Sequence, residues 1–171
     1  DHPFRSLQVT DLLVRLYDLP VLDSEARVAA SGVVIRRAIA PEMHVVLAWI
    51  GHHFHPAWVS EASKGMMQNP VTTWLAVRDG QLLGFACHDT TAKGFFGPTG
   101  VDEAARGQGI GEALLLATLR GMREAGYGYA IIGDPGPVAF YQKRLDAFPI
   151  PKSKPGIYAG MLRGVDDGPM P

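Results

Sequence analysis

The sequence has little of the chemistry that would tie it to an oxidising compartment, a membrane or a nucleic acid. Its single cysteine, Cys87, has no partner for an internal disulfide, which predicts a reducing, cytoplasmic setting. The formal net charge of -1 offers no basic excess to a polyanion or an anionic membrane surface. No apolar run approaches the roughly 20 residues of a spanning helix, and no basic-then-apolar leader opens the chain. We therefore expect neither nucleic acid nor membrane as a partner.

What the chain does have is enough apolar sequence for one folded domain. It contains 171 residues, 47% of them hydrophobic, which suffices for a buried core. Residues 1–6, which start at Asp1, are compatible with either a tag remnant or a natural truncation. We divide the chain into an N-terminal extension (1–32) with an extra, edge strand over 12–19, a main domain (33–163) and a polar tail (164–171).

The hydrophobic pattern predicts strands and helices in an α/β order. Asp79-Gly80 tolerates the positive backbone angles of a tight hairpin between two strands. A later strand–helix–strand crossover predicts one parallel strand pair, and glycine and proline near residue 98 predict a bulge or a splayed end in the first of these strands. The expected strands are 33–40, 71–77, 81–89, 95–101, 127–133 and one or two within 147–163, and the expected helices are 41–51, 57–67, 112–125 and 137–144.

A glycine-rich turn feeds directly into the longest predicted helix. Gly107, Gly109 and Gly111 lie beside Arg106, and a helix start offers unpaired N–H groups and partial positive charge to an anion. A P-loop is excluded because Glu112 stands where it needs lysine. A dinucleotide fingerprint matches weakly, and a tight turn without any ligand remains an alternative.

Three segments in order resemble the GNAT N-acetyltransferase family. "GPTGVDEAARGQGIGEALL" is similar to that family's strand, phosphate turn and helix, whose turn reads Arg/Gln-x-x-Gly-x-Gly/Ala. "YAIIGDPGPVAFYQK" resembles the next strand and the helix that carries the family's tyrosine, and "VVIRRAIAPEMHVVLAWI" resembles the opening strand and helix. The resemblance covers about Val33 to Arg163, so the main domain would be an acetyltransferase domain.

The resemblance implies both a fold and a cosubstrate. The fold would be a GNAT-like mixed, mainly antiparallel sheet with helices on both faces and a splayed parallel strand pair. Acetyl-CoA would lie in the gap between the two splayed parallel strands, and no metal would take part. The N–H of Val101 would face the thioester and the glycine turn would hold the pyrophosphate. The implied cofactor-binding residues are Val101, Arg106, Gly107, Gln108, Gly109, Ile110, Gly111, Glu112, Gly136 and Phe140.

The same resemblance implies catalytic and acceptor residues. Tyr141 would protonate the departing thiolate, and its alternative is packing against the sheet. The general base would be Glu103, with Asp89 and Glu61 as further candidates, although each could be a solvated surface carboxylate. The acceptor wall would comprise Phe54, Trp58, Glu61 and Asp89. In place of the family's frequent asparagine before the tyrosine helix, this chain has Asp134-Pro135-Gly136-Pro137.

Two function classes follow. The first is transfer of an acetyl group from acetyl-CoA to a primary amine of a small molecule or a peptide. The alternative is a non-catalytic module of the same fold that binds CoA or acyl-CoA as a sensor. The histidines at 44, 52, 53 and 55 lack metal-ligand spacing, Cys87 is expected in the core, and exposed edge strands make a homodimer plausible.

Overall fold

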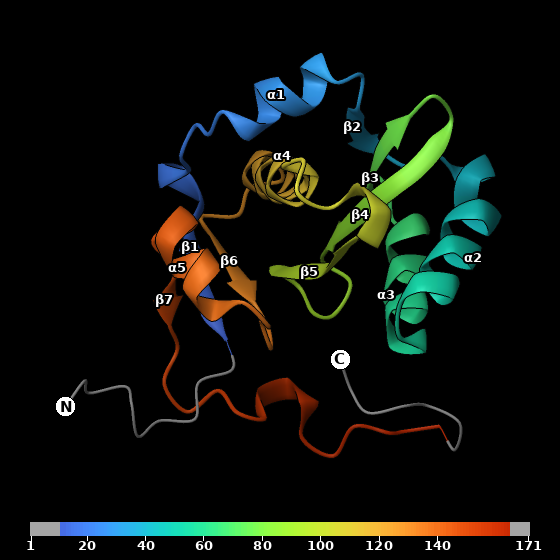
Figure 1. Cartoon of the computed structure of the whole chain (residues 1–171). Helices are drawn as coiled ribbons and strands as arrows, with labels where there is room; N and C mark the ends of the chain where they lie inside the picture. Colours follow the sequence, from blue (N-terminus) through green and yellow to red (C-terminus); the bar gives the residue numbers. More distant parts are fainter. Residues whose placement is uncertain (1–10, 165–171) are drawn as a thin grey trace.

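A seven-stranded mixed sheet forms the centre of the computed structural model, which describes residues 11–164 (Figure 1). The strand order is β2-β3-β4-β5-β6-β1-β7, and β5 and β6 are the parallel pair in an otherwise antiparallel sheet across the described residues. The strands are β1 (Leu12–Arg15), β2 (Val34–Arg37), β3 (Thr73–Arg78), β4 (Gln81–His88), β5 (Phe95–Val101), β6 (Tyr129–Ile132) and β7 (Phe148–Pro149).

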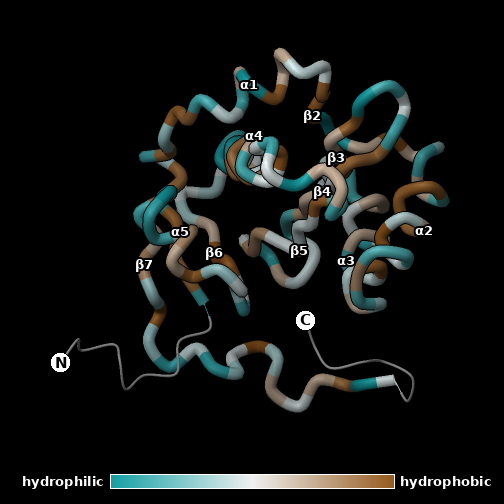
Figure 2. Tube along the Cα trace, viewed as in Figure 1, coloured by the Kyte–Doolittle hydropathy of each residue, from teal (hydrophilic) through white to brown (hydrophobic). Residues whose placement is uncertain are grey.

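Helices cover both faces of this sheet and enclose two apolar cores. One core lies under α1 (Ser24–Ala30), α4 (Ile110–Glu124) and α5 (Val138–Leu145). The other lies under α2 (Met43–His53) and α3 (Pro56–Met66). Figure 2 shows hydrophobic colours along parts of β3, β4, α2 and α4, and hydrophilic colours on part of α5. Within residues 11–164, no helix combines the length and apolar character needed to cross a bilayer. The predicted fold class is confirmed.

The predicted hairpin joins β3 to β4. Asp79 (φ 51°) and Gly80 (φ 73°) both adopt the left-handed backbone that a two-residue hairpin turn requires. The turn pairs Val77 with Leu82, and a register shift between Ala76 and Val77 then brings Leu75 opposite Phe85; both of these side chains enter the core beneath α2 and α3. Local turn chemistry and the alternating apolar pattern predicted the two strands and their turn, and the register shift was not predicted.

The parallel strands separate soon after they meet. β5 pairs with β6 at Phe95–Ile131 and Phe96–Ile132, and β5 then continues to Val101 while β6 diverges (Figure 1). Pro98 has no N–H to offer a neighbouring strand, and a register shift interrupts the β4–β5 ladder between Ala86 and His88. The predicted splayed pair is therefore present, and it leaves one side of β5 open.

The prediction of an edge strand over 12–19 is wrong in position and length. β1 ends at Arg15 and lies inside the sheet, where Leu12 faces Ile132 of β6 on one side and Pro149 of β7 on the other. Leu12 and Val14 are fully buried in the larger core. Hydrophobic alternation identifies a strand but does not say which strands will flank it, because pairing is decided by tertiary packing.

Two other boundaries differ from expectation. The helix expected to end at Gly51 continues to His53, and the strands expected within 147–163 reduce to β7 and a 3-10 turn, η4 (Gly156–Tyr158). The prolines in this last segment remove donors that longer strands would need.

A substitution in β1 tests whether the N-terminal segment is an integral part of the fold. Leu12→Ala should lower the free energy of unfolding by about 2–5 kcal/mol, because it opens a cavity in a closed core. Urea unfolding measures this. The matched control is Val21→Ala, at a side chain that is 96% exposed, which should change stability by less than about 0.5 kcal/mol. Equal, small effects of both changes would contradict the placement of β1.

Candidate functional site

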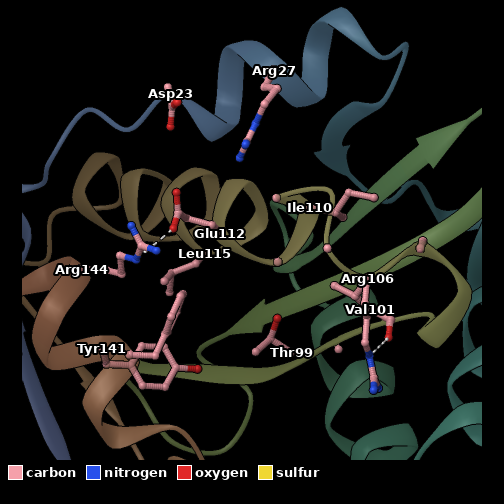
Figure 3. Close-up of a pocket in the computed structure, with 16 residues that line it drawn as sticks. Asp23, Arg27, Thr99, Val101, Arg106, Ile110, Glu112, Leu115, Tyr141 and Arg144 are labelled. Carbon is pink, nitrogen blue, oxygen red and sulfur yellow. Dashed lines mark hydrogen bonds and ion pairs between the residues drawn. The ribbon is translucent and has the colours of Figure 1, made fainter.

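A cavity of about 620 Å³ opens where β5 and β6 separate. Its walls are the free edge of β5, the glycine turn, the first turns of α4, and α5, with α1 above (Figure 3). Because the helix start and the strand edge both present unpaired backbone N–H groups, the cavity is lined by donors that need no side chain. The lining residues are Asp23, Arg27, Thr99, Gly100, Val101, Ala105, Arg106, Gly107, Gly109, Ile110, Gly111, Glu112, Leu115, Phe140, Tyr141 and Arg144.

The glycine turn places the N-terminus of α4 at the cavity. After the short 3-10 helix η3 (Glu103–Ala105), Gly107 (φ 82°) and Gly109 (φ 86°) take left-handed conformations, and α4 begins at Ile110. A side chain at either glycine would be strained, so the sequence pattern is needed for the backbone path. The turn thereby directs the first N–H groups of α4, with their partial positive charge, into the cavity.

The edge of β5 supplies a further donor. The N–H of Asp102 donates to the carbonyl of Leu83 in β4 at 2.8 Å. Successive N–H groups of a strand point to opposite sides, so the N–H of Val101 points away from β4 toward the side that β6 has left open.

Three arginines surround the turn. Arg106 follows η3 and its Nε lies 3.4 Å from the carbonyl oxygen of Val101. Arg27 descends from α1 toward the start of α4 (Figure 3), and its Nη2 lies 2.8 Å from where a Cβ on Gly109 would stand. Arg144 of α5 pairs with Glu112 at 3.4 Å. Arg106 was expected from the sequence, and Arg27 and Arg144 were not, because α1 and α5 reach the turn only through tertiary packing.

Tyr141 of α5 faces the cavity from the opposite wall. The residue is 6% exposed, and its hydroxyl points toward Thr99 of β5 (Figure 3). Burial raises the pKa of this hydroxyl above its ordinary value of 10, so it carries its proton at neutral pH. Phe140 packs edge-on against the ring at 5.4 Å and helps to fix its orientation. A buried, protonated hydroxyl aimed into a cavity can act as a proton donor there.

Of the ten cofactor-binding residues inferred from the family resemblance, eight line this cavity; Gln108 and Gly136 do not, and neither does the candidate base Glu103. Gln108 is exposed, and its side-chain oxygen accepts from Arg78 at 3.4 Å. Gly136 is exposed before α5, and Glu103 is exposed on η3; neither lines the cavity. Sequence proximity to the turn suggested Gln108 and Glu103, but on a tight turn and a short helix alternate side chains point outward.

The aromatic residues of the expected acceptor wall lie behind β5. The ring of Phe54 covers Gly100 so closely that a Cβ there would lie 2.5 Å from it. Phe54 also packs on Trp58, with ring centroids 5.0 Å apart, and on Phe85 at 5.8 Å. These contacts make the pair a supporting layer for the open edge of β5.

The two acidic residues of the expected acceptor wall, Glu61 and Asp89, lie in different surroundings. Glu61 of α3 is largely buried, accepts a hydrogen bond from Thr91, and has a pKa raised by burial against the opposing effects of Thr91 and Lys64. Asp89 instead lies at the closed end of the β5–β6 pair and lines a different cavity. The structure therefore does not bring Asp89 to the site: strand β4 runs antiparallel to β5, which puts its last residues far from the glycine turn.

Other polar residues have structural roles. Among the described residues, no group of three or more His, Cys, Asp or Glu could hold a metal ion. His55 caps α3 by accepting from the N–H of Ala57 at 3.0 Å. Cys87 is fully buried in the core beneath α2 and α3, and burial raises the pKa of its thiol to about 12.

The family of the chain follows from a match to one family model. The model described as the acetyltransferase (GNAT) family matches residues 39–146, which is more than half of the chain. The chain therefore belongs to the GNAT acetyltransferase family. A comparison with curated proteins gives no match.

Solved structures of the same fold are distant in sequence. A GCN5-related glucosamine N-acetyltransferase region of a fungal multi-domain beta-N-acetylglucosaminidase has a TM-score of 0.70 at 17% identity, over 84% of this chain and 20% of that protein. A GCN5-related N-acetyltransferase from Kribbella flavida has a TM-score of 0.56 at 22% identity, over 82% and 54%. An aminoglycoside acetyltransferase from an uncultured soil metagenomic sample scores 0.50 at 16%, over 67% and 88%. The chain thus spans a fifth of the length of the fungal protein and about half of the length of the Kribbella flavida protein.

The contact between Gly100 and Phe54 gives a test of the site's supporting layer. Gly100→Ala should lower the free energy of unfolding by about 1–3 kcal/mol, because the new methyl group forces the ring to move. The same change in a Phe54→Leu background should cost less, which denaturant unfolding of the four proteins measures. Gly111→Ala is the control, since its Cβ would meet only Val101 at 3.6 Å. Additive effects of the Gly100 and Phe54 changes would contradict the contact.

Proposed function

We propose that the protein transfers an acetyl group from acetyl-CoA to a primary amine of a small molecule or a peptide. The observation that carries the proposal is the cavity itself, which has backbone donors at one end and the Tyr141 hydroxyl at the other. Membership of the GNAT acetyltransferase family supports the reaction class. The free, buried Cys87 supports a reducing compartment, in keeping with a cytoplasmic protein.

In this proposal the donor lies along the open edge of β5. The pyrophosphate would accept hydrogen bonds from N–H groups of the turn between Arg106 and Gly111, where the α4 N-terminus favours negative charge. Arg106, Arg27 and Arg144 would add cationic charge around it. The thioester carbonyl would then lie beside the N–H of Val101, which would stabilise negative charge on its oxygen during attack.

The chemistry needs one proton removed and one supplied. The neutral amine attacks the thioester carbon to form the new C–N bond, and collapse of the tetrahedral species breaks the C–S bond. Tyr141 would donate its proton to the departing thiolate, and a base or water would take the proton that the amine loses. Glu61 and Glu103 are the candidate bases. Neither lines the cavity, so either would act through water; burial raises the pKa of Glu61, and Glu103 is exposed on η3.

The proposed acceptor class comes from two solved structures of the same fold. Two of the solved structures of this fold are named for glucosamine and aminoglycoside acetylation, and both kinds of molecule carry primary amines. Primary amines are therefore the first acceptors to screen.

Ligand binding tests the donor site directly. Acetyl-CoA and CoA should raise the melting temperature, and NAD and ATP should not; a ligand at 100 times its Kd stabilises by about 2.7 kcal/mol. Arg27→Gln should weaken CoA binding about fivefold, equivalent to about 1 kcal/mol, while Arg163→Gln, at an exposed position outside the cavity, should leave it unchanged. Stabilisation by NAD or ATP, or by none of the four, would refute the donor site.

Tyr141→Phe tests turnover. With any amine that the wild type acetylates, kcat should fall by about 100-fold or more while the Kd of acetyl-CoA stays nearly constant, because only the proton donor is lost. Tyr17→Phe, at an exposed tyrosine, is the control. In the same assay, loss of the acidic limb of the pH–rate profile in Glu61→Gln but not Glu103→Gln would identify the base. An unchanged kcat in Tyr141→Phe would remove Tyr141 from the mechanism, and CoA binding without acetylation of any amine would favour the sensor module.

A further inference from the structure

A second cavity, of about 410 Å³, lies at the closed end of the β5–β6 pair. It shares no lining residue with the cavity at the glycine turn. Its walls come from β2, α3, the turn between β4 and β5, and the segment that ends α4. The lining residues are Arg37, Lys64, Gln68, Asn69, Pro70, Thr72, His88, Asp89, Lys93, Ala125 and Tyr127.

Two buried polar side chains that line this cavity have unsatisfied atoms. His88 is 2% exposed and Thr72 is 6% exposed. Within residues 11–164, His88 Nε2 and Thr72 Oγ1 have no hydrogen-bond partner. Buried polar atoms are nearly always paired, because an unpaired one costs about 1–3 kcal/mol. Two residues that line one cavity therefore have hydrogen-bonding capacity that the described residues do not use.

The tautomer of His88 is fixed by its neighbour. Its Nδ1 lies 2.6 Å from one carboxylate oxygen of Asp89. The other Asp89 oxygen accepts from the N–H of Gly94 at 2.7 Å and from the Tyr127 hydroxyl at 2.6 Å. The Asp89 carboxylate can only accept, so Nδ1 carries the proton and Nε2 of the neutral ring is a free acceptor. Burial lowers the pKa of His88, so the neutral ring is the form present at neutral pH.

The charges around the cavity favour an anion. Arg37, Lys64 and Lys93 line it, and Asp89, the one carboxylate in the lining, is already held by three donors. Arg37 is fixed by its hydrogen bond to the carbonyl of Val71 at 2.6 Å and by its position 4.6 Å above the ring of Trp74. The cations come from three different elements, so they surround the cavity rather than lining one side.

We propose that this cavity binds a small molecule through a phosphate group. The phosphate oxygens would accept from the Thr72 hydroxyl and from the cations, and a protonated phosphate oxygen would donate to His88 Nε2. A phosphate can supply that proton near neutral pH, because its second pKa is about 6. A carboxylate at neutral pH has no O–H to give. The volume lies within the range of small-molecule pockets and leaves room for an organic part.

Binding of this kind takes up a proton. Above pH 7 the free phosphate and His88 are both without the shared proton, so the complex binds one proton more than its parts and its affinity falls by up to about tenfold for each pH unit. The titratable groups around His88 are Asp89 beside it, Arg37 of β2, Lys64 and Glu61 of α3, Lys93, and Glu124 and Tyr127 at the end of α4. The pH dependence of phosphate binding then reports the proton shared between the phosphate and His88.

The imidazole signals of the full chain, followed by NMR during titration with inorganic phosphate, test the proposal. The His88 signal should shift saturably, and more weakly at pH 8 than at pH 7, whereas phosphate held at the distant glycine turn would leave it unmoved. Lys64→Gln with Lys93→Gln, both at exposed lysines, should weaken the response at least tenfold. Lys152→Gln, an exposed lysine outside the cavity, should not change it.

The His88 signal is assigned by its loss in His88→Gln. If that variant does not fold, through-bond correlation of the ring with the His88 backbone assigns it. A His88 signal that millimolar phosphate leaves unmoved would overturn the proposal. An equal response to succinate would overturn the assignment of phosphate, and an affinity that does not depend on pH would overturn the shared proton.

Discussion

The arrangement of the site depends on how briefly the parallel strands β5 and β6 pair before they separate. β5 and β6 are hydrogen-bonded at only two residue pairs, and beyond them the edge of β5 is free. A strand edge inside a sheet normally has a partner, because each unpaired backbone group that is buried costs free energy. Here the edge remains available along a cavity, and β4, Phe54 and Trp58 support it from the other side. Both the proposed place of the thioester and the position of the glycine turn follow from this divergence.

The N-terminal segment keeps β6 apart from the free part of β5. β1 occupies the place beside β6, so the strand that leaves β5 is held by an antiparallel neighbour instead of closing the gap. The chain then continues into α1, which packs along α4 and carries Arg27 to the start of that helix. Residues that look like an extension in the sequence thus determine both the width of the opening and part of its charge.

The sequence could predict features that are encoded locally. The Asp79-Gly80 turn, the alternation in β3 and β4, and the spacing of Gly107, Gly109 and Gly111 each impose a backbone path on a few consecutive residues. The family resemblance added the order of the segments and the place of Tyr141. The features that the sequence did not predict are set by tertiary packing. They are the internal position of β1, the positions of Arg27 and Arg144 beside the glycine turn, and the distance of Asp89 from the site. A carboxylate or an arginine carries no local signal of which distant element it will face.

The burial of Cys87 has a practical consequence for the study of this protein. The one thiol of the chain belongs to β4 and lies in the core beneath α2 and α3, 3.5 Å from the Thr73 hydroxyl of β3, and it holds its proton up to strongly alkaline pH. Reagents that react with thiolates will therefore leave the folded protein unlabelled. In an assay of the proposed reaction, a thiol that reacts while the protein stays folded therefore comes from released CoA, and labelling of Cys87 in a separate experiment without acetyl-CoA reports unfolding.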